Sequence, residues 1–599
     1  MYIRKTKTRV VKGVPYYSYR MVESIRDTLG KVKQRTLLNL GAQYTIIPES
    51  DHVLLSERVE NIISGQQSLF VLSEKLETEA QRIAHLIIKK HSQPIASTGK
   101  QLEAQYDLVN LTTIENSDVR TVGAEHLVYE TAKKLSLPQI LAGCGLSAKE
   151  TQEALATIIG RVIFPGSELH TANCLRSKSS LDELLATDFS NLHKNRLYKI
   201  SDILLKNKEA IESKLYKREQ ELFNFKEIVT LYDLTNTYFE GTSLSNDNGA
   251  FGRSKEKRSD CKLVTLALVL DSSGFPKKSK IFKGNISEGA TLEEMLKAVS
   301  GKEAVVVMDA GIATEDNINW LTNNDYKYLV ISRKRNQSIP EIEGVIVKDD
   351  PDNKVTSFLV KTDKESELYC HSEGMEKRSN IILQKHIDRF ETELKKISEG
   401  LTKKGTIKKY DSIQQKIGRL KEKHSKVGCQ FKINITSDEK KEFVTQLTWT
   451  IHPEKQSKAP GIYCIRTNQT QLNNQEIWNI YRMLNDIEDA FRALKTDLGL
   501  RPVYHQKTDR ISGHIFIAVL AYHLLHSIRY QLIKHGINDC WQTIMFKLSN
   551  HFRITNSLQR KNYKTIHIRK SMMANPEQLA IYKACCVPTS ILNSTLTTY

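Results

Sequence analysis

Three acidic side chains of this chain occupy positions suited to holding a metal ion. Asp233 follows the apolar run IVTLY and Asp309 follows AVVVM, and both runs have the pattern of buried strands. Carboxylates at strand ends point into the crevice where open α/β sheets bind ligands. The third acid, Glu488, lies in YRMLNDIEDAFRALK (residues 481–495), whose apolar residues at spacings of three and four predict an amphipathic helix. Such an all-oxygen set suits Mg²⁺ or Mn²⁺, and pairs of these ions promote displacement at a phosphodiester.

Each acid also has an ordinary structural interpretation. Asp233 is able to cap the TNTY turn that follows it, and Asp309 is able to orient the AGI turn. Glu488 is able to pair with Arg492 one helical turn away. We favour catalysis because all three acids occur together, in this order and in these surroundings.

The segments around the three acids form a wider pattern. Tyr481, Glu488 and Lys495 match the spacing Y-x2-R-x3-E-x6-K, although Leu484 occupies the arginine position. The blocks LYDLTNTYFEG and VVVMDAGIATEDNINWL surround the two aspartates, KGNISEGATLEEM lies between them, and RPVYHQKTDRISGHIFIAVLAYHLL follows the helix. Together with the opening hairpin and RTLLNLG, these blocks resemble the DDE transposases of bacterial insertion sequences. The resemblance is to larger members of the type-four superfamily, which has the Tyr-Arg-Glu-Lys motif.

The resemblance implies DNA transposition, by cleavage at the element's ends and attack of the freed 3′-hydroxyl on target DNA. It assigns catalysis and two Mg²⁺ or Mn²⁺ ions to Asp233, Asp309 and Glu488. It also implies double-stranded DNA partners, namely terminal inverted repeats and target DNA, and at least a homodimer, since two ends must be brought together. The residues we expect to contact DNA are Tyr481, Lys495, Arg482, Arg492, Asn236 and Arg510.

Several of these assignments have alternatives. Tyr481 and Lys495 share a helix face with Glu488 in the predicted helix, since two heptads drift by only about 40°. They suit phosphate contact, but a core tyrosine and a surface lysine would give the same pattern. Arg482 or Arg492 would supply the charge missing at Leu484. That departure also leaves two other functions open, a nuclease of the same fold without strand transfer and an inactive, domesticated DNA-binding protein.

Composition places the chain among nucleic-acid-binding proteins of a reducing compartment. Lys and Arg number 88 against 69 Asp and Glu, a formal net charge of +19, and so basic a balance favours a polyanionic partner. The alternative is a merely basic protein. Nine cysteines without a C-x-x-C pair, a charged N-terminus and a longest apolar run of only residues 515–525 predict a cytoplasmic protein without a membrane partner. The resemblance implies that this cytoplasm is bacterial and that the protein is nucleoid-associated. His505, His514 and His523 lie nine residues apart without soft-ligand partners, which favours packing or phosphate contact over metal binding.

The periodicity predicts an α/β ribonuclease-H-like core, a mixed sheet with flanking helices, which the resemblance also implies. A β-rich and helical insertion interrupts this core, and a mostly helical region precedes it. The basic hairpin of the insertion either contacts DNA or is a solvated face, and the helical domain before the core either reads DNA ends or is a spacer. The expected domains are a β-hairpin and helical segment (1–100), a helical domain (101–225), the first part of the core (226–340), the insertion (341–470), the completion of the core with the glutamate helix (471–535) and a helical tail (536–599).

Overall fold

The computed structural model divides the chain into two compact units, Met1–Leu222 with Ala493–Tyr599, and Phe223–Arg492. Asp233, Asp309 and Glu488 all belong to the second unit. The structure describes residues 1–11, 14–26, 32–42, 44–66, 72–91, 93–94, 107–224, 229–240, 246–252, 260–297, 303–333, 338–439, 442–452 and 460–598.

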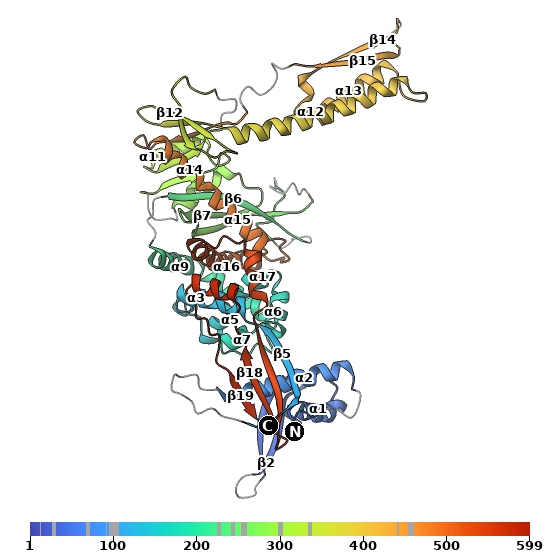
Figure 1. The fold of residues 1–599 in the computed structure, drawn as a ribbon, viewed down its shortest axis with the longest axis vertical. Coiled ribbons are helices and arrows are strands. Elements are labelled where there is room, and N and C mark those ends of the chain that lie inside the picture. The colour runs from blue at the N-terminus through green and yellow to red at the C-terminus, as the bar shows by residue number, and fades with distance from the viewer. Residues whose placement is uncertain are drawn as a thin grey trace. The chain divides into compact units, whose positions relative to one another are not determined.

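A nine-stranded mixed sheet forms the centre of the second unit, with the order β11-β12-β13-β16-β10-β9-β6-β7-β8. Strands β6, β7 and β8 are antiparallel, whereas β9 runs parallel to both β6 and β10. The central part of this sheet has five strands with two helices between them, in agreement with the predicted mixed sheet with flanking helices. Their bounds are β6 Val229–Tyr238, β7 Leu263–Asp271, β8 Pro276–Lys283, α10 Leu292–Lys297, β9 Val305–Met308, α11 Glu315–Asn323 and β10 Lys327–Ile331 (Figure 1).

The two faces of this sheet are covered by different helices. Tyr232 and Met308 are fully buried on one face, in a hydrophobic cluster with residues of α10 and α11. Side chains alternate along a strand, so Asp233, the next residue after Tyr232, is directed to the opposite face. Helix α15 (Leu484–Arg492), which contains Glu488, lies against β6.

The insertion is less separate from the core than the boundary at residue 341 implied. Four of its strands continue the core sheet, because β13 and β16 pair with each other and β16 pairs with β10. The predicted boundary at residue 341 therefore divides one hydrogen-bonded sheet. The four strands are β11 Val345–Lys348, β12 Val355–Lys361, β13 Ser366–Ser372 and β16 Ile462–Thr467.

The remainder of the insertion has a hydrophobic core of its own. Helix α12 (Glu373–Thr402) packs on α13 (Tyr410–Lys423), and both lie beside the ribbon of β14 (Phe431–Ser437) and β15 (Val444–Ile451) (Figure 1). Phe390 of α12 is fully buried in this core. The predicted helical hairpin is confirmed, and its turn and second helix carry much of the positive charge discussed below.

The segment 481–495 is not the single helix that its periodicity predicted. Helix α14 (Asn474–Arg482) ends at Met483, α15 follows, and residues Ala493–Asp497 form a π-helical turn. The backbone N–H of Met483 still bonds to the carbonyl of Ile480, and the chain then turns. The segment is therefore not one regular helix, and a common stripe of Tyr481, Glu488 and Lys495 stays a prediction.

The first unit combines helices with two antiparallel sheets. Strands β1 Tyr2–Val11, β2 Val14–Arg26 and β3 Val32–Ala42 pair in sequence order, as predicted, and pack on α1 and α2. Helix α5 starts at a capping box, in which Ser147 accepts from the N–H of Glu150. The helices before the core are α1 His52–Ile63, α2 Glu74–His91, α3 Gly123–Lys134, α4 Leu137–Ala142, α5 Ala148–Ile163, α6 Glu168–Ser177, α7 Leu181–Leu184, α8 Lys194–Lys206 and α9 Lys208–Phe223. Their role in reading DNA ends stays a prediction.

The C-terminal tail is not wholly helical, which corrects the prediction for residues 536–599. Strands β17 (Phe552–Arg560) and β18 (Thr565–Ser571) form a hairpin, and β17 also pairs with β5 (Val109–Thr121). The pairing partner of β17, strand β5, lies more than 400 residues earlier in the chain, so this sheet is not evident from the local sequence. The five-stranded sheet has the order β4-β19-β18-β17-β5, and its remaining elements are β4 Gln93–Pro94 and β19 Thr595–Thr598, with α17 Trp541–Ser549 and α18 Pro576–Ala584 beside the strands.

Helix α16 (Thr508–Lys534) confirms the helix predicted after the glutamate segment. Among the described residues it alone is long and apolar enough, by length and composition, to cross a membrane. However, 89% of its apolar window is buried inside the folded chain. A core helix of a folded unit has these properties, and α16 packs on α3, α5 and α8 of its own unit.

Candidate active site

Asp233 and Asp309 lie next to each other at one edge of the parallel part of the sheet. In the register of β6 and β9, Tyr232 pairs with Met308, and each aspartate is the next residue along the chain. Neighbouring strands are about 4.8 Å apart, so this register brings the two carboxylates together. Asp233 does not end its strand, as the sequence suggested, because β6 continues to Tyr238 in an antiparallel pairing with β7.

Asp309 begins a tight turn that leads from β9 to α11. Its side chain is exposed, and its Oδ1 accepts from the backbone N–H of Ala310 at 2.6 Å. Its carbonyl accepts from the N–H groups of Ile312 and Ala313 at 3.0 and 3.1 Å. This backbone bonding directs the carboxylate out of the sheet edge rather than into the core.

Tyr481 lies within electrostatic range of both Asp309 and Glu488. Burial raises the pKa of Tyr481 to about 12, and its acidic neighbours Cys370, Asp309 and Glu488 add to the rise. Its ring lies 5.5 Å from that of Tyr463, which holds it at this position. Tyr481 of α14 therefore lies near one carboxylate of the sheet edge, Asp309, and one of α15, Glu488.

The arginines near the glutamate have defined partners. Arg482 stacks over the ring of Trp478 at 4.9 Å, and Arg492 forms an ion pair with Asp489 at 2.8 Å. Leu484, at the motif's arginine position, is the first residue of α15. Both arginines stay predictions as DNA contacts, with Arg492 the more exposed, at 72% of its side chain.

The three other predicted DNA contacts lie in different settings. Asn236 of β6 donates from Nδ2 to Thr265 Oγ1 at 2.9 Å and lines a cavity described below. Arg510 forms an ion pair with Asp202 at 2.9 Å, within the first unit. Lys495 lies in the π-helical turn and also belongs to that unit. The roles of all three in DNA binding stay predictions.

Two residues that the sequence reading missed lie beside the turn after Asp309. Arg333, two residues past β10, donates to the carbonyls of Ala310 and Gly311. Glu288 lies against Gly311 from the other side. Both border a cavity of about 1100 Å³ whose lining also includes amide and hydroxyl side chains, among them Asn236 and Thr265. The sequence signals were a charged residue closely following a strand and an acid within the KGNISEGATLEEM block.

Comparison with known proteins identifies the family. Residues 224–524, half of the chain, match the family model described as the transposase DDE domain. The chain belongs to the DDE transposases of bacterial insertion sequences. Residues 3–54 of the transposase match a second model, the N-terminal domain of IS1634 family transposases. The resemblance found in the sequence is therefore confirmed at the level of this family.

The comparisons with individual proteins add less. The cryo-EM structure of the piggyBac transposase synaptic complex with hairpin DNA is similar over 74% of this chain and 82% of that chain, at 9% identity and a TM-score of 0.31. No curated protein matches the chain. Family membership makes the transposase an enzyme of DNA transposition that binds DNA, in a family that generally uses a divalent metal ion.

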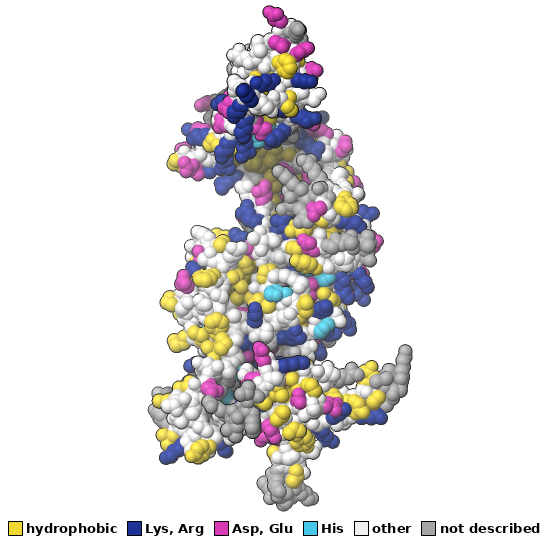
Figure 2. Space-filling model, turned by 90° about the vertical axis from the view of Figure 1, so that its right-hand side faces the viewer, with side chains coloured by type: hydrophobic (Ala, Val, Ile, Leu, Met, Phe, Trp, Pro, Cys, Tyr) yellow, Lys and Arg dark blue, Asp and Glu magenta, His cyan; other side chains and the backbone are white. Residues whose placement is uncertain are grey.

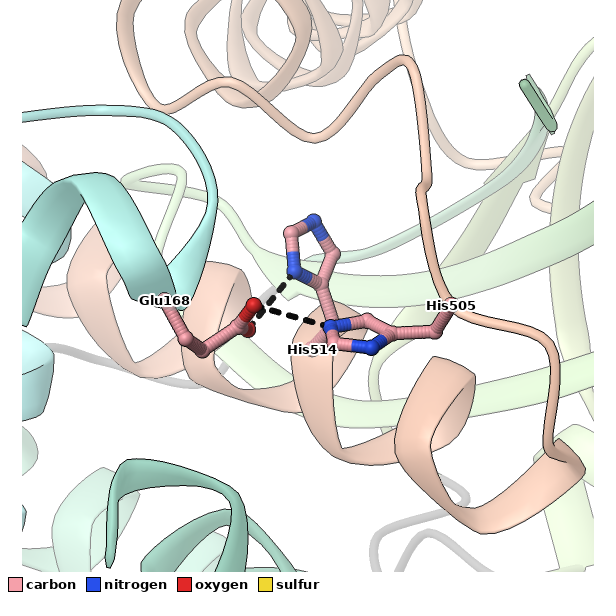
Figure 3. Close-up of side chains that lie close together, drawn as sticks. All are labelled: Glu168, His505 and His514. Carbon is pink, nitrogen blue, oxygen red and sulfur yellow. Dashed lines mark hydrogen bonds and ion pairs between the residues drawn. The ribbon is translucent and has the colours of Figure 1, made fainter. Parts of the chain in front are cut away.

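The first unit of the transposase contains a buried charged cluster, shown in Figure 3. Glu168 lies between two histidines, with Oε2 at 2.9 Å from His505 Nε2 and Oε1 at 3.1 Å from His514 Nδ1. Arg161 approaches the same groups, with Nη2 at 3.0 Å from His514 Nδ1 and 3.4 Å from Glu168 Oε1. Its Nη1 donates to the carbonyl of Gly166 at 2.6 Å.

This cluster has metal-ligand spacing but the chemistry of an ion-pair network. The three ligand atoms of Glu168, His505 and His514 lie within 4.8 Å of one another. However, the Arg161 guanidinium already binds His514 Nδ1 and would repel a cation. Burial and this charge lower the pKa of His514 to about 4. For Glu168, burial acts to raise the pKa, but the hydrogen bonds from the two histidines and the charge of Arg161 outweigh it. The pKa of Glu168 is therefore lowered. The sequence-based preference for packing over metal binding at these histidines agrees with this arrangement.

Proposed function

We propose that the transposase has a ribonuclease-H-like core in which Asp233, Asp309 and Glu488 hold the catalytic metal ions. The order β8-β7-β6-β9-β10, with three antiparallel strands followed by parallel ones, supports this fold. The proposal depends chiefly on the pairing of Tyr232 with Met308, which brings Asp233 and Asp309 to one edge of the sheet. Tyr481 and the packing of α15 on β6 support the addition of Glu488.

The donor chemistry of these residues fits two Mg²⁺ or Mn²⁺ ions. All three acids offer carboxylate oxygens, the ligands that these hard cations prefer. Asp309 and Glu488 are exposed and Asp233 is partly buried, so the side chains are accessible to ions and to DNA. Bound ions would activate the attacking oxygen and stabilise the charge that develops on the leaving oxygen.

Two successive in-line substitutions at phosphorus make up the proposed reaction. In the first, a water oxygen forms the new P–O bond at the element's end and the 3′-oxygen leaves, which yields a 3′-hydroxyl. In the second, this hydroxyl bonds to a phosphorus of the target and the target's own 3′-oxygen leaves. Like an unperturbed tyrosine, Tyr481 keeps its phenolic proton near neutral pH and is able to donate a hydrogen bond to a phosphate oxygen.

The proposed DNA partners are the terminal inverted repeats of the element and a target duplex. Lys495, Arg482, Arg492, Asn236 and Arg510 would contact the strands around the scissile phosphate. We propose that a homodimer joins two ends, and that the transposase works in the bacterial cytoplasm on nucleoid DNA.

A strand-transfer assay tests this function. Pre-cleaved element ends with a free 3′-hydroxyl, incubated with the transposase, Mg²⁺ and a supercoiled target plasmid, are expected to become covalently joined to the plasmid. Ends that terminate in a 3′-deoxynucleotide serve as the control, because they lack the attacking oxygen. Cleavage of uncut ends without any joining of pre-cleaved ends would instead assign the chain to the nucleases.

The insertion supplies a surface suited to the DNA backbone. Residues 403–432 contain ten Lys or Arg side chains and two acidic ones, and most of the basic ones are exposed. In Figure 2, Lys and Arg side chains gather near the top of the view, where α12–β15 lie. Phosphate contacts release counterions, so each contact adds about 0.9 to the slope of log affinity against log salt. We therefore expect DNA binding by this surface to be strongly salt-dependent.

Replacing Lys403, Lys404 and Lys409 by glutamine is expected to reduce that slope by up to about 0.9 per lysine. Fluorescence anisotropy with labelled end DNA over a series of salt concentrations measures the change. The matched control replaces Lys364, Lys377 and Lys385, exposed lysines of the same unit outside the basic stretch. Equal slopes of log affinity against log salt for the two triple variants would indicate that residues 403–432 are a solvated face that does not contact DNA.

A further inference from the structure

The turn after Asp309 is held by a single guanidinium. Arg333 follows β10, which runs parallel to β9 with Val330 paired to Met308. Its Nε donates to the carbonyl of Ala310 and its Nη2 to the carbonyl of Gly311, both at 2.5 Å. A planar guanidinium bound at two nitrogens fixes both the position and the orientation of these consecutive carbonyls.

The opposite side of the turn is closed by Glu288. A Cβ added to Gly311 would lie 2.1 Å from Glu288 Oε2 and 3.8 Å from Asp309 Oδ2. A side chain at Gly311 would therefore displace the Glu288 carboxylate, so the turn lies in contact with both Glu288 and Arg333.

Glu288 is itself fixed to the strand that carries the other aspartate. Thr291 Oγ1 donates to the Glu288 carbonyl at 2.8 Å and also bonds to the Tyr232 hydroxyl at 2.5 Å. Tyr232 is fully buried and immediately precedes Asp233. A continuous set of contacts thus connects the strand of Asp233 with the turn of Asp309.

We propose that Arg333 is a positioning residue that sets the Asp309 carboxylate for divalent metal binding. Its route of action is the backbone, because Asp309 Oδ1 accepts from the N–H of Ala310, whose carbonyl Arg333 holds. This inference depends on the proposed role of Asp309 as a metal ligand. The competing role for Arg333, which is exposed and borders the 1100 Å³ cavity, is direct contact with a DNA phosphate.

Metal affinity distinguishes the two roles. Mn²⁺ binding to the full-length protein without DNA is measured by electron paramagnetic resonance of the free ion, for the wild type and for Arg333→Met, Arg333→Lys and Asp309→Asn. Arg333→Met is expected to weaken Mn²⁺ affinity by about tenfold or more, the usual effect of losing a residue that orients a metal ligand. Arg333→Lys is expected to restore little, because an ammonium does not reproduce the two-point contact. Arg389→Met, at an exposed position on α12, is the matched control and should leave the affinity unchanged.

DNA binding in Ca²⁺ provides the second readout. The inference requires Arg333→Met to bind end DNA as the wild type does, with an unchanged thermal midpoint. Wild-type Mn²⁺ affinity in Arg333→Met, together with weakened DNA binding that Arg333→Lys restores, would overturn it in favour of phosphate contact. If Arg333→Met does not fold, Arg333→Gln takes its place, because an amide can reach at most one of the two carbonyls, and it is expected to weaken Mn²⁺ binding as well. Unchanged Mn²⁺ affinity in Asp309→Asn would overturn the proposed metal site itself, whereas a loss in Asp309→Asn alone would overturn only the role of Arg333.

Discussion

Glu488→Gln is expected to lower the rate of strand cleavage at the element's ends by about a thousandfold while leaving the affinity for end DNA unchanged. Glutamine keeps the size and hydrogen bonding of the side chain but removes the charge that holds a metal ion. Glu488 is exposed on α15, so the substitution leaves no buried group without a partner. Cleavage of a labelled duplex and its binding in Ca²⁺ are measured in parallel.

Asp233→Asn and Asp309→Asn should behave like Glu488→Gln, and double variants should be little worse than single ones, because the three carboxylates act as one unit. The matched control is Asp489→Asn, one residue further along α15, where the acid forms an ion pair with Arg492 one helical turn away. Equal and partial losses in all of these variants, with thermal midpoints falling in step, would indicate a structural polar cluster instead of a catalytic site.

Removal of divalent metal is expected to have an effect at least as large. Cleavage and strand transfer should require Mg²⁺ or Mn²⁺ and should cease in excess chelator, because neither step has another means of activating the attacking oxygen in the proposed site. Ca²⁺ should support DNA binding but little chemistry, since its larger and more variable coordination places the reacting oxygens poorly. Titration of each metal against the rate of end cleavage provides the measurement.

The metal series also tests the alternative centre at Glu168, His505 and His514. Imidazole ligands favour Zn²⁺ over Mg²⁺, so activity that depends on Zn²⁺ would indicate that this cluster binds the functional metal ion. Full activity in excess chelator would contradict both centres. The arrangement around Arg161 leads us to expect neither result.

Local patterns in the sequence were enough to predict many of the elements around the proposed site. Asp233 and Asp309 each follow a run of apolar, mostly β-branched residues, and such runs form buried strands through side-chain properties that are evident within a few residues. The helical hairpin of the insertion and helix α16 were recognisable for the same reason, because their apolar periodicity extends over several turns. The family resemblance rested on the order of these local blocks.

The local pattern was less reliable where a helix is interrupted. Residues 481–495 keep apolar spacing throughout, yet the chain turns at Met483 and widens into a π-helical turn at Ala493–Asp497. Periodicity records which residues are apolar and not how the backbone bonds. The relation of Tyr481 to Glu488 therefore became apparent from the packing around α14 and α15.

The sequence by itself determined which residues were able to form strands, helices and a carboxylate site, whereas the tertiary structure decided which of them meet. The register of Tyr232 with Met308 places the two aspartates together, and Arg333 and Glu288 reach the turn of Asp309 from separate elements. Likewise, β17 pairs with β5, and four strands of the insertion extend the core sheet. These contacts join segments tens to hundreds of residues apart. Their stability depends on burial and hydrogen bonding that exist only once both partners are in place, so no short stretch of sequence contains them.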